Sequence, residues 1–160
     1  MQALSSSEMQ YWLMKSEPDV FGIDDLKRRP DKTEPWDGVR NYQARNMMRD
    51  QMKKGDKAFF YHSNCDVPGI VGVMKVVKGS YPDYTAQDPE NKYYDPKASE
   101  ENPRWFMVNV KYVKKFKRTI TLAELKSDPA LQDMLLVKKG SRLSIMPVTE
   151  QQWLHIESLL

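Results

Sequence analysis

Short runs of apolar residues alternate with polar segments along this 160-residue chain, in lengths typical of strands and short helices. Four runs rich in β-branched and aromatic residues predict strands at residues 11–15, 57–62, 69–78 and 105–117. The last run alternates, with Phe106, Val108, Val110 and Tyr112 on one side, which is typical of a half-buried strand. A fifth, short strand is predicted at residues 142–146, ending before Pro147.

Capping signals predict several short helices between these strands. One covers residues 23–29, and a second covers residues 41–53, with Asn41 as its N-cap and Gly55 after its end. The patterns Thr-x-x-Glu at Thr121 and Thr-x-x-Gln at Thr149 are capping boxes, which open helices through Lys126 and to the C-terminus. Pro129 is a further possible helix start.

This order of elements predicts an α+β fold, a mixed β-barrel flanked by short helices. A chain of this length forms one domain, which we expect over residues 11–160, after a polar and frayed segment at residues 1–10. Residues 80–104 interrupt the pattern with four prolines and four tyrosines. An irregular segment of this length is usually functional or disordered, and the tyrosines argue against disorder.

Composition narrows the functional classes. The chain is 40% hydrophobic and 29% charged, with a net charge of +3, so nucleic acid is permitted as a partner but not demanded. One cysteine and two histidines make neither a disulfide nor a Cys/His metal cluster. No apolar run is long enough for a membrane span, and no signal peptide is evident. We therefore expect a cytoplasmic protein, nuclear if eukaryotic, with no metal, no cofactor and no membrane partner.

Catalytic signatures are weak. The sequence has no nucleophile elbow, no phosphate-binding loop, no dinucleotide fingerprint and no zinc-protease motif. Cys65 follows His62 by three residues, but no third group orients the pair, so a passive thiol is the simpler interpretation. Asp24, Asp25 and Asp37 are explained by helix-start and turn roles. The sequence does not predict an enzyme.

Residues 36–46 are the most informative segment, because a Trp and a Gly turn lead directly into a helix rich in amide and guanidinium groups. An indole face beside backbone N–H groups at the positive end of a helix suits a planar ligand with polar edges, such as a nucleobase. The alternative is a core Trp36 before a solvated helix, and these residues alone do not separate the two. Trp12 and Trp153 are expected in the core, while Trp105 is either core or part of a base-binding cage.

Two basic runs, residues 114–118 and 138–142, are either solvated faces or phosphate contacts beside a base pocket. In the second case, the residues that would contact the nucleic-acid backbone are Arg40, Lys114, Lys115, Lys117, Lys139 and Arg142.

Four motifs, at residues 11–18, 36–46, 59–64 and 139–144, resemble those of EVE domains, and the resemblance covers residues 11–159. The family is PUA-like, a curved β-barrel with flanking helices, and is related to YTH domains, which read methylated adenine in RNA. The resemblance implies a pocket for a modified base, with methylated or hydroxymethylated cytosine in DNA as the candidates.

By this resemblance, Lys15 and Ser16 correspond to a Lys-Ser pair of YTH domains, and Trp36 corresponds to a cage tryptophan. Tyr84 is the better placed of the loop tyrosines for a third wall. The full set of ligand-binding residues expected is Lys15, Ser16, Trp36, Asn41, Tyr61, Ser63, Tyr84 and Trp105. The favoured function is a monomeric reader of modified bases, and the alternative is a hydrolase or nuclease acting on modified nucleic acid or a nucleotide.

Overall fold

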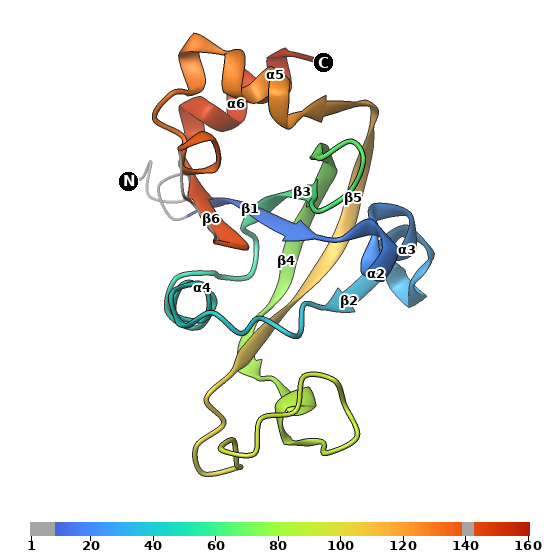
Figure 1. Cartoon of the computed structure of the whole chain (residues 1–160), viewed down its shortest axis with the longest axis vertical. Helices are drawn as coiled ribbons and strands as arrows, with labels where there is room; N and C mark the ends of the chain where they lie inside the picture. Colours follow the sequence, from blue (N-terminus) through green and yellow to red (C-terminus); the bar gives the residue numbers. More distant parts are fainter. Residues whose placement is uncertain (1–8, 139–142) are drawn as a thin grey trace.

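The computed structural model describes residues 9–138 and 143–160, and within them six strands form one mixed sheet (Figure 1). The strands are β1 (Tyr11–Ser16), β2 (Thr33–Pro35), β3 (Lys57–His62), β4 (Gly69–Pro82), β5 (Phe106–Thr121) and β6 (Ile145–Val148). Their order across the sheet is β2-β5-β4-β3-β1-β6, and all neighbours are antiparallel except β1 and β3. The predicted PUA-like α+β fold is confirmed.

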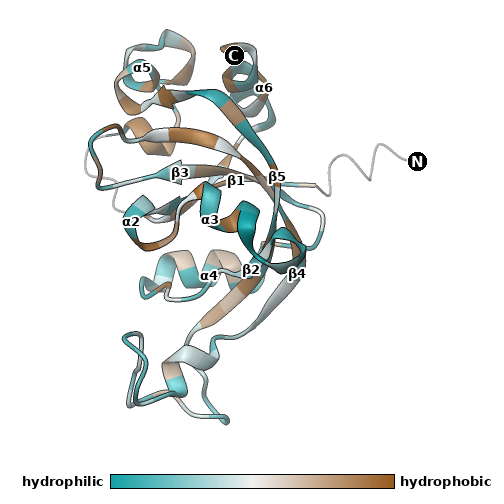
Figure 2. Cartoon of the chain, turned by 90° about the vertical axis from the view of Figure 1, so that its right-hand side faces the viewer, coloured by the Kyte–Doolittle hydropathy of each residue, from teal (hydrophilic) through white to brown (hydrophobic). Residues whose placement is uncertain are grey.

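Both faces of this sheet are covered, as Figure 2 shows, by helices on opposite sides. One side carries α2 (Pro18–Phe21), α3 (Ile23–Arg28) and α4 (Tyr42–Asp50), and the other carries α5 (Leu122–Ser127) and α6 (Glu150–Ser158). Short 3-10 turns lie at Pro30–Lys32, Tyr84–Gln87, Pro129–Leu131 and Leu135–Val137. Because both faces are buried, the central strands read as nearly continuous apolar runs.

Alternate residues of the strands enter two apolar clusters, one on each face. Trp12 and Phe60 belong to the cluster under α3 and α4, whereas Leu13 and Phe59 belong to the cluster under α5 and α6. Trp153 stacks on Phe59 with ring centroids 3.8 Å apart, so the core roles predicted for Trp12 and Trp153 are confirmed.

Several predicted boundaries were wrong for local reasons. The second helix ends at Asp50, before Lys53, because the next residues turn back and the backbone N–H of Lys53 donates to the carboxylate of Asp56. The capping box predicted at Thr121 is only half formed. The Thr121 hydroxyl accepts from the backbone N–H of Glu124, but the Glu124 carboxylate pairs with Arg118 instead of accepting from the backbone N–H of Thr121. The last strand continues through Pro147, which an edge strand tolerates. The short edge strand β2 was not predicted.

Strands β4 and β5 are longer than predicted, and they extend away from the helices as an antiparallel arm (Figure 1). The arm carries the loop of residues 83–105 at its end. Of the helices that the structure describes, none has both the length and the apolar character needed to cross a membrane. Nor do three or more potential metal ligands among His, Cys, Asp and Glu gather anywhere in that part of the chain.

Candidate functional site

A pocket of about 810 Å³ lies where the end of β1, the strand β2, the start of α4 and the loop of residues 90–93 converge. Its volume falls within the range of about 300–1,000 Å³ that is usual for small-molecule sites. The lining mixes aromatic rings with polar and charged groups, so the pocket suits a ligand with flat faces and hydrogen-bonding edges.

Trp36 forms part of the apolar wall. The whole residue is only 7% exposed, and its backbone N–H donates to the carbonyl of Val108 at 2.7 Å. Edge-to-face contacts with Phe60 (5.5 Å between ring centroids) and Phe21 (6.5 Å) fix the ring. The two interpretations of this residue are therefore both correct in part: most of the indole is core, and the remaining surface lines the pocket.

Ser16 and Asn41 supply oriented polar groups. The hydroxyl of Ser16 donates to the carbonyl of Phe21 at 2.7 Å, which leaves the serine oxygen as an acceptor toward the pocket. Asn41 is the N-cap of α4, as predicted, and its side-chain oxygen accepts from the N–H of Ala44 at 3.0 Å. Because the oxygen caps the helix, the NH₂ group of Asn41 is the part left to donate to a ligand.

Charged groups of both signs reach the same pocket. The guanidinium-bearing residues Arg29 and Arg40 line it, whereas Lys15 borders the pocket with its ammonium 5.7 Å from the ring centroid of Tyr61, its partner across β1 and β3, where burial lowers the pKa of Lys15. Burial raises the pKa of Asp37, and the negative charge of Asp83 adds to this effect. Burial also raises the pKa of Glu34, whose carboxylate is 3.1 Å from the guanidinium of Arg29. The pocket thus presents both donors and acceptors.

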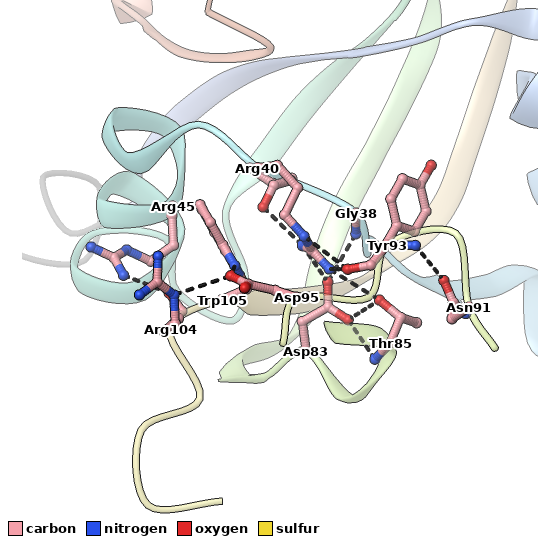
Figure 3. A network of polar contacts seen from close by, with 11 residues as sticks. Gly38, Arg40, Arg45, Asp83, Thr85, Asn91, Tyr93, Asp95, Arg104 and Trp105 are labelled. Atoms are coloured by element: carbon pink, nitrogen blue, oxygen red, sulfur yellow. Dashed lines mark hydrogen bonds and ion pairs between the residues drawn. The ribbon is translucent and has the colours of Figure 1, made fainter. Parts of the chain in front are cut away.

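The outer wall is Tyr93, which a polar network holds in place (Figure 3). Arg40 donates to the carbonyl of Tyr93 at 2.8 Å and to the carboxylate of Asp83 at 3.1 Å. Asp83 is fully buried, and it also accepts from the backbone N–H groups of Gly38 and Thr85, each at 2.9 Å. Arg40 therefore ties the loop of residues 83–95 to the turn before α4.

The structure brings most of the expected ligand-binding residues together. Those that line the pocket are Lys15, Ser16, Trp36, Asn41 and Ser63, and Arg40 lines it as well. Tyr61, Tyr84 and Trp105 are not among the lining residues. Tyr61 belongs to the cluster on the opposite face of the sheet, because it alternates with Phe60 along β3.

Tyr84 and Trp105 occupy other positions at the arm. Tyr84 is 59% exposed and begins a 3-10 turn. Trp105 is buried, stacks on Tyr42 with ring centroids 4.8 Å apart, and donates its indole N–H to Asp95 at 2.7 Å. Of the two interpretations of Trp105, the structure supports a packing role.

The expected backbone-binding cations are dispersed. Lys114 pairs with Glu157 at 3.6 Å, Lys115 pairs with Asp24 at 3.0 Å, and neither they nor Lys117 line the pocket. Lys139 and Arg142 lie outside the described residues. The phosphate-binding role of these residues stays a prediction, and Arg40 is largely engaged inside the protein.

Sequence reasoning missed several lining residues, notably Phe21, Arg29, Glu34 and Tyr93. The first three lie on or beside α2, α3 and β2, short elements with little periodic signal. For Tyr93 the sequence offered only the concentration of tyrosines in one loop, and nothing local marked it over Tyr84.

The mixed sheet covered on both faces, with a polar and aromatic pocket beside the ends of β1 and β2, places the chain in the PUA-like α+β fold class. Residues 10–159 match the model of the EVE domain. The chain belongs to this family, so the resemblance seen in the sequence is confirmed.

Known relatives agree with this assignment. Thymocyte nuclear protein 1 from Homo sapiens is 49% identical over a region that covers 93% of this chain and 73% of that protein. The protein of the same name from Danio rerio is 48% identical over 92% of this chain and 71% of its own length.

Two solved structures are equally similar in sequence, and a third shares the fold alone. A protein from Pseudomonas syringae has a TM-score of 0.89 at 52% identity, covering 93% of this chain and 98% of that one. Human THYN1 in complex with DNA containing 5-methylcytosine has a TM-score of 0.88 at 49% identity, covering 94% and 96%. The YTH domain of Zygosaccharomyces rouxii MRB1 shares the fold, with a TM-score of 0.52 at 16% identity over 94% and 86%.

Proposed function

We propose that this protein binds DNA that contains 5-methylcytosine and that the pocket receives the modified base. The observation that carries the proposal is the similarity to human THYN1, whose structure holds DNA with that base, at 49% identity over 94% of this chain. The pocket beside Trp36 gives the proposal a physical site.

The polar groups of the pocket complement the pairing edge of cytosine. That edge has an amino group that donates and ring acceptors beside it. The oxygen of Ser16 and the carboxylate of Asp37 supply acceptors for the amino group of cytosine. The side-chain NH₂ group of Asn41 supplies a donor for the ring acceptors of cytosine. Trp36 supplies an apolar wall next to the base plane.

Base extrusion from a duplex costs a few kcal/mol of unstacking. Stacking against an aromatic side chain returns roughly 1–3 kcal/mol per base, so the walls Trp36 and Tyr93 offset much of that cost. We expect Lys15 and Ser63 to complete the lining of the pocket around the bound base.

A binding role fits the titratable groups in and around the pocket better than catalysis. His62 accepts the backbone N–H of Ile23 at 3.2 Å, so this imidazole is committed to helix α3 and is not a base for Cys65. Glu34, a carboxylate in the pocket, is held by Arg29. We further propose that the protein acts as a monomer, in the cytoplasm or, in a eukaryote, the nucleus, without metal or cofactor.

The test is equilibrium binding to duplexes that differ in one base, carrying cytosine, 5-methylcytosine, 5-hydroxymethylcytosine or N6-methyladenine. One methyl group recognised in a pocket contributes about 1–3 kcal/mol, so we expect binding to the 5-methylcytosine duplex to be tighter by about fivefold or more. Equal affinity for cytosine and 5-methylcytosine would contradict the proposal.

A further inference from the structure

A second group of cations lies outside the pocket, on the exposed side of α4. Arg45 and Arg49 are one turn apart on this helix, and Arg104 reaches the same place from the end of the loop. Tyr42, 48% exposed, lies between them, with the guanidinium carbons of Arg45 and Arg104 at 4.7 and 5.8 Å from its ring centroid.

Aromatic packing holds these guanidinium groups in place. Tyr42 stacks on Trp105, the hydroxyl of Tyr42 accepts from Arg104, and Arg45 donates to the backbone carbonyl of Arg104 at 2.5 Å. A guanidinium that is already oriented loses little side-chain entropy when it binds an anion. We call Tyr42, Arg45, Arg49 and Arg104 the arginine face.

Positive charge exceeds negative charge on the arginine face. Arg49 pairs with Asp50 at 2.8 Å and Arg104 pairs with Asp95 at 3.1 Å, but among the described residues Arg45 has no ion-pair partner. Burial lowers the pKa of Arg45, and the positive charge of Arg49 lowers it further. An anionic partner would relieve this crowding of cations.

The arginine face is continuous with the pocket. Arg40 lies over both Tyr93, the outer wall of the pocket, and Trp105, with its guanidinium carbon 5.4 and 5.2 Å from their ring centroids. Figure 3 shows the sequence of side chains from Tyr93 through Arg40 and Trp105 to Arg45 and Arg104. A strand that delivers a base into the pocket would therefore pass close to Arg45 and Arg104.

We infer that the arginine face binds the phosphodiester backbone of the nucleotides that flank the base in the pocket. The inference rests on the proposed function and adds to it the surface that holds the strand. The chemistry is that of guanidinium forks on phosphate oxygens, which position nucleic acid without reading its sequence. The basic run of residues 114–118 is the competing surface.

The test is the salt dependence of binding to one duplex with and without 5-methylcytosine, for Arg45→Gln, Arg49→Gln and the wild type. Each lost phosphate contact makes the negative slope of log K against log salt less steep by about 0.9. The loss of affinity caused by the substitution is therefore about threefold larger at 50 mM than at 200 mM salt. We expect both variants to weaken binding to the two duplexes by the same factor, because methylation is read elsewhere. Arg49→Gln removes no tertiary hydrogen bond of its side chain among those described, so it keeps the test valid if Arg45→Gln disturbs the loop.

Arg118→Gln is the matched control, because Arg118 is also a partly exposed arginine with a carboxylate partner, Glu124. It belongs to the competing basic run of residues 114–118. A reduced slope for Arg118→Gln with unchanged slopes for Arg45→Gln and Arg49→Gln would overturn the inference and favour that run.

Two further outcomes separate the two proposals. If the wild type prefers 5-methylcytosine but both α4 variants keep its slope, the inference is overturned while the proposed function stands. If the wild type binds neither duplex and the arginine face instead binds a poly-aspartate peptide, the anion is a protein and both proposals are overturned.

Discussion

The ring of Tyr93 rests directly on the α-carbon of Gly38, so the outer wall of the pocket is packed against the turn that precedes α4. A β-carbon added at Gly38 would lie 2.6 Å from Cε2 and 2.7 Å from Cε1 of that ring. Gly38 also has a φ of +76°, a conformation that residues with a β-carbon rarely adopt. Glycine is therefore required here both for the turn and for the position of Tyr93.

Gly38→Ala should accordingly displace Tyr93 and weaken binding to methylated DNA. Gly55→Ala is the matched control, because Gly55 also has a positive φ (+99°) but no heavy atom within 4 Å of the added β-carbon. We expect Gly55→Ala to cost about 1–2 kcal/mol of unfolding free energy from backbone strain alone. Gly38→Ala should cost more, as measured by denaturant unfolding, and only it should reduce affinity. Equal costs and unchanged binding would show that Tyr93 moves freely.

Asp83→Asn should destabilise the contact between Arg40 and the loop that carries Tyr93. Asp83 is fully buried, and its loss of charge leaves the guanidinium of Arg40, 24% exposed, without its counter-ion. Removing one partner of a buried pair costs about 3–5 kcal/mol, and we expect about 3 kcal/mol because Arg40 keeps some exposure. The measurement is the denaturation midpoint. Asp50→Asn, which breaks the exposed pair with Arg49, should change stability little. Similar effects of the two substitutions would contradict a structural role for Asp83.

Features set by neighbouring residues were predictable from the sequence. The strands β1 and β3, the N-cap Asn41 and the capping box at Thr149 depend on local periodicity and on side chains that bond to their own helix. The lining residues Ser16 and Trp36 were found because they stand at the ends of such elements.

Features set by long-range packing were not predictable from the sequence. Tyr93 lines the pocket because Arg40 and Asp83, 43 positions apart in the chain, bond to each other. No local pattern encodes that contact. The orientation of Tyr61 was in principle accessible, since Phe60 and Tyr61 must face opposite sides of a strand, but which side holds the pocket depends on where α4 packs.

Trp36 should be the main contributor to base binding. Trp36→Ala removes the indole, and we expect a loss of roughly 1–3 kcal/mol, or about ten- to a hundredfold in affinity for DNA with 5-methylcytosine. Because the indole is mostly buried, the same change should also cost about 3–5 kcal/mol of stability. Trp36→Phe, which keeps an aromatic ring, is the variant for binding assays if the alanine variant does not fold.

Trp153→Phe is the control for this loss of packing. Trp153 is also buried, with 2% of the residue exposed against 7% for Trp36, but it stacks on Phe59 at the far face of the sheet. Isothermal binding measurements should show wild-type affinity for Trp153→Phe and a reduced affinity for Trp36→Phe. If both variants bind like the wild type, the indole of Trp36 is core only.

His62 should make the stability of the fold depend on pH below 6.5, the usual pKa of a histidine. Its Nε2 accepts the backbone N–H of Ile23 at the start of α3, and only the neutral imidazole has an acceptor there. Burial accordingly lowers the pKa of His62 below its usual value of 6.5. The unfolded chain therefore binds the proton at a higher pH than the folded protein. The stabilisation is complete above pH 6.5 and is lost as the pH falls from 6.5 through the lower, folded pKa. Thermal unfolding between pH 5.5 and 7.5 measures this loss, and comparison with His62→Gln separates it from the titration of carboxylates such as Asp37 and Glu34, whose pKa values burial raises. His62→Gln keeps a side-chain acceptor that does not titrate, so its midpoint should vary less with pH in this range.

His155→Gln is the control for this prediction. It changes the other histidine, which sits 2.6 Å from Asp128 on the opposite face, and should leave the His62 component of the pH dependence intact. If the wild type and His62→Gln have parallel pH profiles, the bond from Ile23 does not control the acid stability of this region.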